Sequence, residues 1–178
     1  MSSVNFRPTI KQNNLQTVNG GISFRYISEK HFGLITELNF AQRGWSEDHS
    51  DTTLTYSRTL NYVELPFLTH LYFGNKKIRY IINLGPKIAY LISDKENRNF
   101  TDNNTDSPQH GKKIDNRFDY GLCFGTGFEL RTPIGNFMLE GRYHYGLGDI
   151  FSNSKKDYFA RSANQIAQVS LTYLIDLK

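Results

Sequence analysis

Apolar and polar residues alternate with a period of two along nearly the whole chain. This period belongs to β-strands with one apolar side, whereas an amphipathic helix repeats every 3.6 residues. The clearest run is residues 79–93. Its apolar face carries Tyr80, Ile82, Leu84, Ile88, Tyr90 and Ile92, and its other face carries Arg79, Asn83, Gly85 and Lys87. The alternation predicts an all-β protein of one domain over residues 1–178.

The same pattern predicts further strands at residues 20–28, 31–45, 61–73, 118–131, 136–145 and 168–177. The strand at 61–73 is less regular, because the face opposite its apolar side mixes Tyr62, Glu64, Leu68, His70 and Tyr72. Pro66 and Pro86 lie inside predicted strands, where each removes a backbone donor. We therefore expect bulges or local breaks in pairing at both prolines.

Short and long connections alternate between these strands. Residues 28–30, 74–77 and 132–135 are short, while residues 46–60, 94–117 and 148–164 are long and rich in Asn, Asp, Ser and Lys. Transmembrane barrels have short turns at one end and long outer loops at the other. The connections therefore favour a barrel that crosses a membrane.

The number of strands raises a question about the first residues. Seven strands are visible, and bacterial barrels of this kind have an even number. Residues 7–18 fit an outer loop, which leaves residues 2–6 as part of a strand, with Val4 and Phe6 expected to face outward. Because a spanning strand needs roughly 9 to 11 residues, we expect the first strand to be truncated at the N-terminus. We expect its missing half, and a signal peptide, to be encoded upstream.

Alternation alone does not separate a membrane barrel from a soluble one, because inverting the sheet gives the same pattern. The composition of the polar face favours the membrane. It carries charges of both signs in near balance, and Gly121, Gly125 and Gly127 leave room for long side chains. Buried charges must be paired, so we expect a charge network in the lumen made of Arg25, Glu37, Arg43, Glu64, Arg79, Lys87, Asp119, Glu129, Glu140 and Arg142.

Aromatic residues of the apolar face gather toward the two ends of the predicted strands, with aliphatic residues between them. One group is Tyr26, Phe32, Phe73, Tyr80, Phe128 and Phe137, and the other is Phe40, Tyr90, Tyr120, Tyr143 and Tyr145. Two aromatic belts around an aliphatic band are typical of a barrel wall in a bilayer. The sequence therefore predicts an eight-stranded, antiparallel, up-and-down transmembrane β-barrel.

Several stretches resemble a known family: NYVELPFLTHLYFG, INLGPKIAYLIS, FDYGLCFGTGFEL, LEGRYHYGLGDIF and VSLTYLIDLK. From about residue 20 to the end, the chain is similar to PorT-like outer-membrane barrels of Bacteroidetes, often labelled porin family proteins. The matching positions are residues 64–66, 85–86 and 142–143. The resemblance implies an eight-stranded barrel in the bacterial outer membrane, and most members of this family have no assigned activity.

Few residues suggest chemistry. His70 and His144 point into the predicted lumen, where a nearby carboxylate could complete an acid–base pair, although capping of an interior network explains them as well. Asp102, Asn104 and Asp106 have the spacing of a calcium loop but lack its glycine and its last carboxylate. We predict no catalytic residue, no metal and no cofactor. The net charge of +4 comes with no nucleic-acid-binding motif.

The long loops are the remaining candidates for function. They carry cations that could contact lipopolysaccharide phosphates or a protein partner, namely Lys112, Lys113, Lys155, Lys156 and Arg161. The sequence thus favours a non-enzymatic barrel with a plugged, charged lumen and a structural or interaction role. The alternatives are a component of a secretion complex, an enzyme with its site at the rim, and a soluble ligand-binding barrel.

Overall fold

The computed structural model describes residues 1–9, 12–48, 55–98, 110–152 and 158–176. These residues form strands and connections, with no helix among them that could cross a membrane. The strands are β1 Ser2–Arg7, β2 Asn13–Asn14, β3 Asn19–Glu29, β4 Phe32–Asp48, β5 Thr55–Gly74, β6 Ile78–Arg98, β7 Phe118–Thr132, β8 Gly135–Asp149 and β9 Arg161–Leu174.

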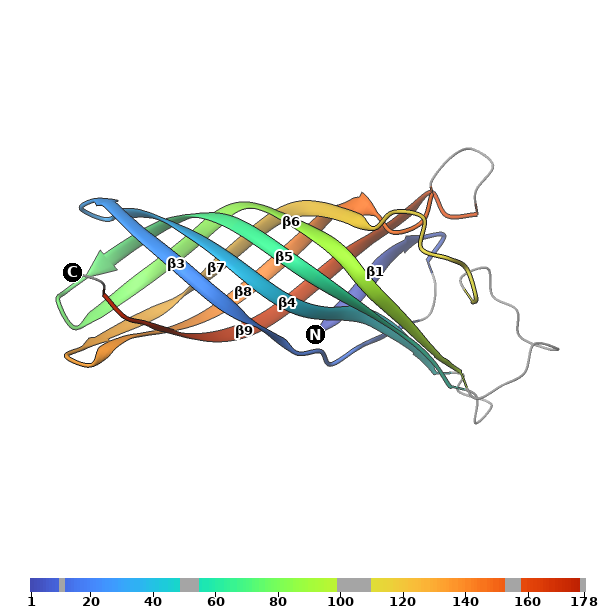
Figure 1. The fold of residues 1–178 in the computed structure, drawn as a ribbon, viewed down its shortest axis with the longest axis horizontal. Helices are drawn as coiled ribbons and strands as arrows, with labels where there is room; N and C mark the ends of the chain where they lie inside the picture. Colours follow the sequence, from blue (N-terminus) through green and yellow to red (C-terminus); the bar gives the residue numbers. More distant parts are fainter. Residues whose placement is uncertain (10–11, 49–54, 99–109, 153–157, 177–178) are drawn as a thin grey trace.

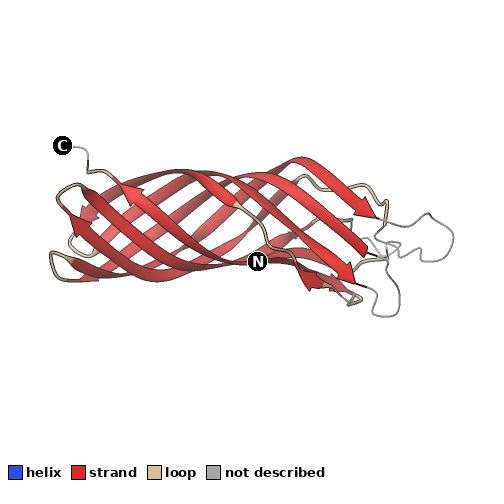
Figure 2. Ribbon diagram, turned by 90° about the horizontal axis from the view of Figure 1, so that it is seen from below, coloured by secondary structure: helices blue, strands red, loops and turns tan. Residues whose placement is uncertain are grey.

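Neighbouring strands from β3 to β9 pair antiparallel in chain order, and the sheet curves into the barrel shape of Figure 1. The turns after β3, β5 and β7 are short and lie at the end that holds the C-terminus (Figures 1 and 2). The longer connections lie at the opposite end. The predicted all-β, antiparallel, up-and-down arrangement is confirmed, whereas the sheet is not closed: β3 and β9 are not paired with each other.

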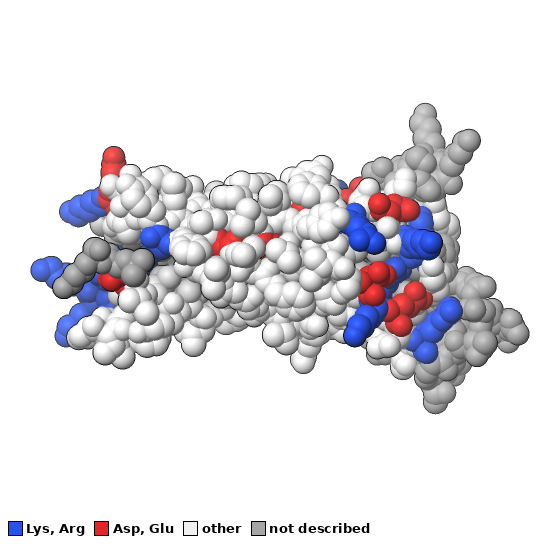
Figure 3. All heavy atoms as spheres, in the orientation of Figure 1, with Lys and Arg blue, Asp and Glu red and all other residues white. Residues whose placement is uncertain are grey.

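The outer surface between the two ends is apolar. Large side chains of every long strand are exposed there, among them Leu34, Phe67, Leu84, Tyr90, Leu122, Phe128, Leu139 and Leu171. In Figure 3 charged side chains gather at both ends and the band between them is almost entirely uncharged. Eight of the ten charged residues expected in the lumen are buried. A soluble barrel requires the opposite orientation of charged and apolar residues, so that alternative is wrong.

The interior holds apolar side chains as well as charges. At the long-loop end, a group that we call the outer apolar cluster is buried: Val4, Phe6, Trp45, Tyr56, Leu60, Tyr62, Ala89, Leu91, Ile150, Phe151 and Phe159. The expectation that Val4 and Phe6 face outward is therefore wrong. Both are almost completely buried, and the ring of Phe6 lies 5.2 Å from that of Trp45. They face inward because the interior at this end is apolar.

The strands are also longer than the alternation predicted. Residues 46–60 were expected to form a loop, but β4 continues to Asp48 and β5 begins at Thr55. Likewise β6 continues to Arg98. Along Thr55–Leu60 the outward residues are Thr and Ser, so the apolar face that marks a strand within the bilayer is missing there.

The prolines interrupt pairing without shifting it. The β5–β6 ladder has the same register at Pro66↔Lys87 and at Thr69↔Leu84, with a gap between the two pairs. The expected local break is therefore present, but the bulge in this ladder lies at Asn61–Tyr62 instead.

Candidate functional site

The most distinctive site of the barrel is its interior, where the ten charged residues expected in the lumen form ion pairs with one another. Near the outer apolar cluster, Arg43 of β4 lies between Glu64 of β5 and Asp119 of β7. The Arg43 Nε lies 2.8 Å from a Glu64 oxygen, and Lys87 Nζ lies 2.9 Å from the other oxygen of the same carboxylate. Asn164 adds a hydrogen bond to Asp119. All four charges are buried, so each depends on its partners to offset the loss of water.

A second group of charges lies further toward the short turns. Arg142 of β8 donates to both oxygens of Glu37, at 2.7 and 2.9 Å, and to Glu140 at 2.7 Å. The bidentate pair joins β8 to β4, which are not neighbours in the sheet. Because a fork of this kind fixes both distance and orientation, it holds opposite walls of the barrel together.

The third group is nearest the short turns. Arg25 of β3 lies 2.5 Å from Glu129 of β7, and Arg79 lies 3.9 Å from the other oxygen of that carboxylate. Arg25 and Arg131 also reach Asp176, which follows β9. The pair of Arg25 with Glu129 connects β3 to β7, which are not neighbours in the sheet, whereas Arg79 and Glu129 lie opposite each other on the neighbouring strands β6 and β7.

Glycines make room for this network. A Cβ atom built on Gly125 would overlap the carboxylate of Glu140, and one on Gly121 would lie 2.8 Å from the His144 ring. A residue larger than glycine at either position would therefore occupy space that the interior side chains need.

The two histidines expected in the lumen, His70 and His144, are not joined to carboxylates, whereas His110 lies 3.2 Å from the Glu47 carboxylate. His70 Nδ1 lies 2.7 Å from the Asn83 side-chain oxygen. Both ring nitrogens of His144 are buried without a hydrogen-bond partner among the described residues. That part of the chain also contains no group of three or more His, Cys, Asp and Glu residues able to hold a metal ion. Neither histidine is therefore arranged as half of an acid–base pair, and the possible calcium residues 102–106 lie outside the described part.

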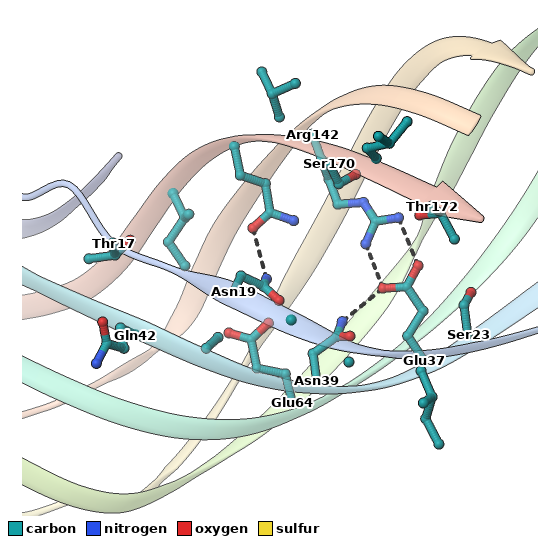
Figure 4. Close-up of a pocket in the computed structure, with 18 of the residues that line it drawn as sticks. Thr17, Asn19, Ser23, Glu37, Asn39, Gln42, Glu64, Arg142, Ser170 and Thr172 are labelled. Carbon is teal, nitrogen blue, oxygen red and sulfur yellow. Dashed lines mark hydrogen bonds and ion pairs between the residues drawn. The ribbon is translucent and has the colours of Figure 1, made fainter. Parts of the chain in front are cut away.

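An opening in the wall leads into the interior between β3 and β9. It is a cavity of about 760 Å³ lined by both strands and, at its floor, by Glu37, Asn39 and Arg142 (Figure 4). One side-chain hydrogen bond spans it, from Asn19 of β3 to Gln168 of β9, at 3.1 Å.

The cations expected at the outer loops are placed differently from one another. Lys112 lies above the outer apolar cluster, with Nζ 5.0 Å from the Phe151 ring centre, and Lys113 lines a second hollow beside it. Arg161 is the first residue of β9 rather than a loop residue, and it donates to the Tyr145 hydroxyl at 2.8 Å. Lys155 and Lys156 lie outside the described residues.

The sequence analysis missed a polar group at this end. Arg58 is buried and donates to Asp94 and to the Lys112 carbonyl, both at 2.7 Å. Trp45 donates to Glu47 at 2.8 Å. Tyr56, Arg58 and Leu60 alternate with small polar residues, and this alternation could have indicated a strand that places Arg58 in the interior.

Comparison with known proteins agrees with this architecture. The model of the family described as outer membrane protein beta-barrel domain matches residues 1–152. The chain belongs to this family, and it is a small protein of the outer membrane. No curated protein and no solved structure matches it.

Proposed function

We propose that this protein is a closed-lumen outer-membrane barrel that works through its structure and its outer end, without conducting solutes or catalysing a reaction. The observation that carries the proposal is that side chains block the interior at successive heights along the barrel axis, despite the cavity at the opening in the wall. Three groups of paired charges and the outer apolar cluster succeed one another along the barrel. An eight-stranded barrel has an interior only wide enough to be filled by side chains.

Conductance in planar bilayers tests the proposal. The folded protein is expected to give no large, stable single-channel steps. The variant Arg142→Ala, which removes the side chain that bridges β8 and β4, should conduct more than the wild type because it leaves empty space in the interior. Large, stable steps from the wild-type protein would contradict the proposal.

The outer end is the proposed contact surface. Lys112 and Lys113 are described there, and Lys155 and Lys156 belong to the same end by sequence. Cations of this kind suit the phosphates of lipopolysaccharide. Replacing Lys112 and Lys113 together with Gln should weaken co-purification of lipopolysaccharide, whereas Lys76→Gln with Lys77→Gln, at the opposite end, should not. Equal binding by both double variants would refute this contact.

The likeness of several strands to PorT-like proteins supports an alternative, in which the barrel is a component of a secretion complex. Crosslinking in intact cells separates the two. A reproducible protein partner captured through Lys113 would favour the complex, and its absence together with lipid contact would favour the first proposal.

A further inference from the structure

Two strand edges face each other across the opening without pairing. On the side toward β9, β3 has no strand partner among the described residues, and residues 168–174 of β9 are paired only with β8. Their backbone N–H and C=O groups therefore lie unpaired in the middle of the apolar band. In hydrocarbon each such group costs several kcal/mol, which is why membrane barrels are closed.

Polar side chains in the opening also lack hydrogen-bond partners. The hydroxyls of Ser23 on β3 and Ser170 on β9 are buried without a partner in the described part of the chain, and both residues line the cavity. Acidic side chains are visible midway along the apolar band in Figure 3, on the face of the barrel that β3 crosses in Figure 1. Glu37 and Glu64 line this cavity although both are buried, so the opening brings charged groups close to lipid, where they are costly.

The register of β1 leads directly into the opening. β1 pairs antiparallel with the other half of β9, from Arg7↔Arg161 to Ser2↔Ile166. Met1 continues this ladder by exchanging two backbone hydrogen bonds with Ala167, at 2.8 and 3.0 Å. Figures 1 and 2 show that the N-terminus lies partway along the barrel, and Met1 lines the cavity at the opening.

We propose that an antiparallel β-strand continuous with β1, formed by polypeptide that precedes Met1 in the precursor, fills the opening and closes the barrel. This strand would pair with both unpaired edges, since it runs antiparallel to β3 as well as to β9. Residues 168–174 give it a length of about seven residues, or roughly 23 Å at 3.3 Å per residue. Joined to β1, it forms a continuous strand longer than the roughly 9 to 11 residues that a tilted spanning strand needs.

The neighbouring faces define the chemistry of the added strand. Its first, third and fifth residues before Met1 lie opposite Gln168, Ser170 and Thr172, which face the interior. These positions take small or polar side chains that can bond the two serine hydroxyls. The second, fourth and sixth residues lie opposite Val169, Leu171 and Tyr173, which are exposed, and they take apolar side chains.

Disulfide trapping in the outer membrane tests the proposal on the full precursor, with Cys123→Ala to remove the native thiol. Ser170→Cys is combined with a cysteine at the third residue before Met1. Counting from the hydrogen-bonded pair Met1↔Ala167, these two positions form a non-hydrogen-bonded pair, whose Cα atoms are about 4.5 Å apart. We expect most of the unboiled protein to carry an intramolecular disulfide, since this separation suits the bond.

The matched control combines Ser170→Cys with a cysteine at the second residue before Met1, which faces the lipid instead of the interior and should not be trapped. Thr172→Cys with the fifth residue gives a second test if the first pair folds poorly. Three outcomes would overturn the proposal: a mature protein that begins at Met1, equal trapping of both pairs, or a disulfide to another polypeptide chain.

Discussion

Replacement of Arg43 should destabilise the barrel more than loss of any surface charge. Its side chain is completely buried, contacts the carboxylates of Glu64 and Asp119, and lies over the Tyr62 ring at 4.4 Å from the centroid. Arg43→Met keeps most of the side-chain volume and removes the charge. It leaves Glu64 with Lys87 as its remaining cation, and Asp119 with only the Asn164 amide.

The size of the effect follows from the burial of both partners. Removing one member of a buried ion pair typically costs 3–5 kcal/mol, since the other charge stays in the interior uncompensated. We therefore expect Arg43→Met to lower the free energy of unfolding by about 3–5 kcal/mol. Adding Asp119→Asn to that variant should restore part of the lost unfolding free energy, because Asp119 is then no longer an unpaired buried charge. We expect a coupling energy of about 1–3 kcal/mol between the two substitutions.

The assay is reversible urea unfolding in lipid vesicles, followed by tryptophan fluorescence. Trp45 is the single tryptophan and is fully buried in the outer apolar cluster, so its emission reports on the folded barrel. The control is Arg131→Met, the same substitution in the ion pair with Asp176, where both side chains are partly exposed. It should cost less than about 1 kcal/mol.

An Arg43→Met variant that loses no more unfolding free energy than Arg131→Met would contradict this prediction. The prediction also fails if Asp119→Asn adds its full effect to that of Arg43→Met, because the two side chains would then not interact in the folded barrel.

Three further predictions test other parts of the structure. Leu122→Arg places a charge on the lipid-facing surface and should cost about 2–4 kcal/mol in vesicles; no change in urea unfolding would mean that this face does not meet lipid. Gly125→Ala should displace the Glu140 carboxylate and cost about 1–3 kcal/mol by overpacking, and unchanged stability would refute the close fit. The Asn136 amide and Arg131 hold the pKa of Asp176 below its usual range. Ionised Asp176 should therefore stabilise the folded barrel above the ordinary aspartate pKa, and this stabilisation should be lost as pH falls through the lowered pKa. Asp176→Asn should flatten the acid side of the plot of unfolding free energy against pH. An unchanged plot would contradict this.

The alternation of residue types predicted most of the fold because each strand inside the bilayer has one lipid-facing side. The middle parts of strands β3 to β8 lie where the pattern placed them, whereas β9 begins at Arg161, seven residues before the predicted start at residue 168. The exposure of Leu84 and Leu122 agrees with the predicted faces. The ten interior charges were named for the same reason, since every second residue of a strand points inward. Which charges pair could not be predicted, because pairs such as Arg142 with Glu37 depend on how the barrel curves.

The pattern was misleading where the strands extend beyond the apolar band. Outward residues there are polar, so the strand at Tyr56, Arg58 and Leu60 resembled a loop. Val4 and Phe6 were assigned to the lipid-facing side because apolar residues elsewhere face outward. In the outer apolar cluster, apolar residues face the interior instead. No local sequence pattern shows where along the barrel axis this cluster begins.

Electrophoretic mobility shows whether the chain forms a closed transmembrane barrel with its apolar face toward lipid. The protein, folded in detergent, is run on SDS gels with and without boiling. We expect a shifted band for the unboiled sample, because a barrel stabilised by interior ion pairs resists unfolding by SDS. A single band unaffected by heat, from protein that stays in solution without detergent, would contradict it.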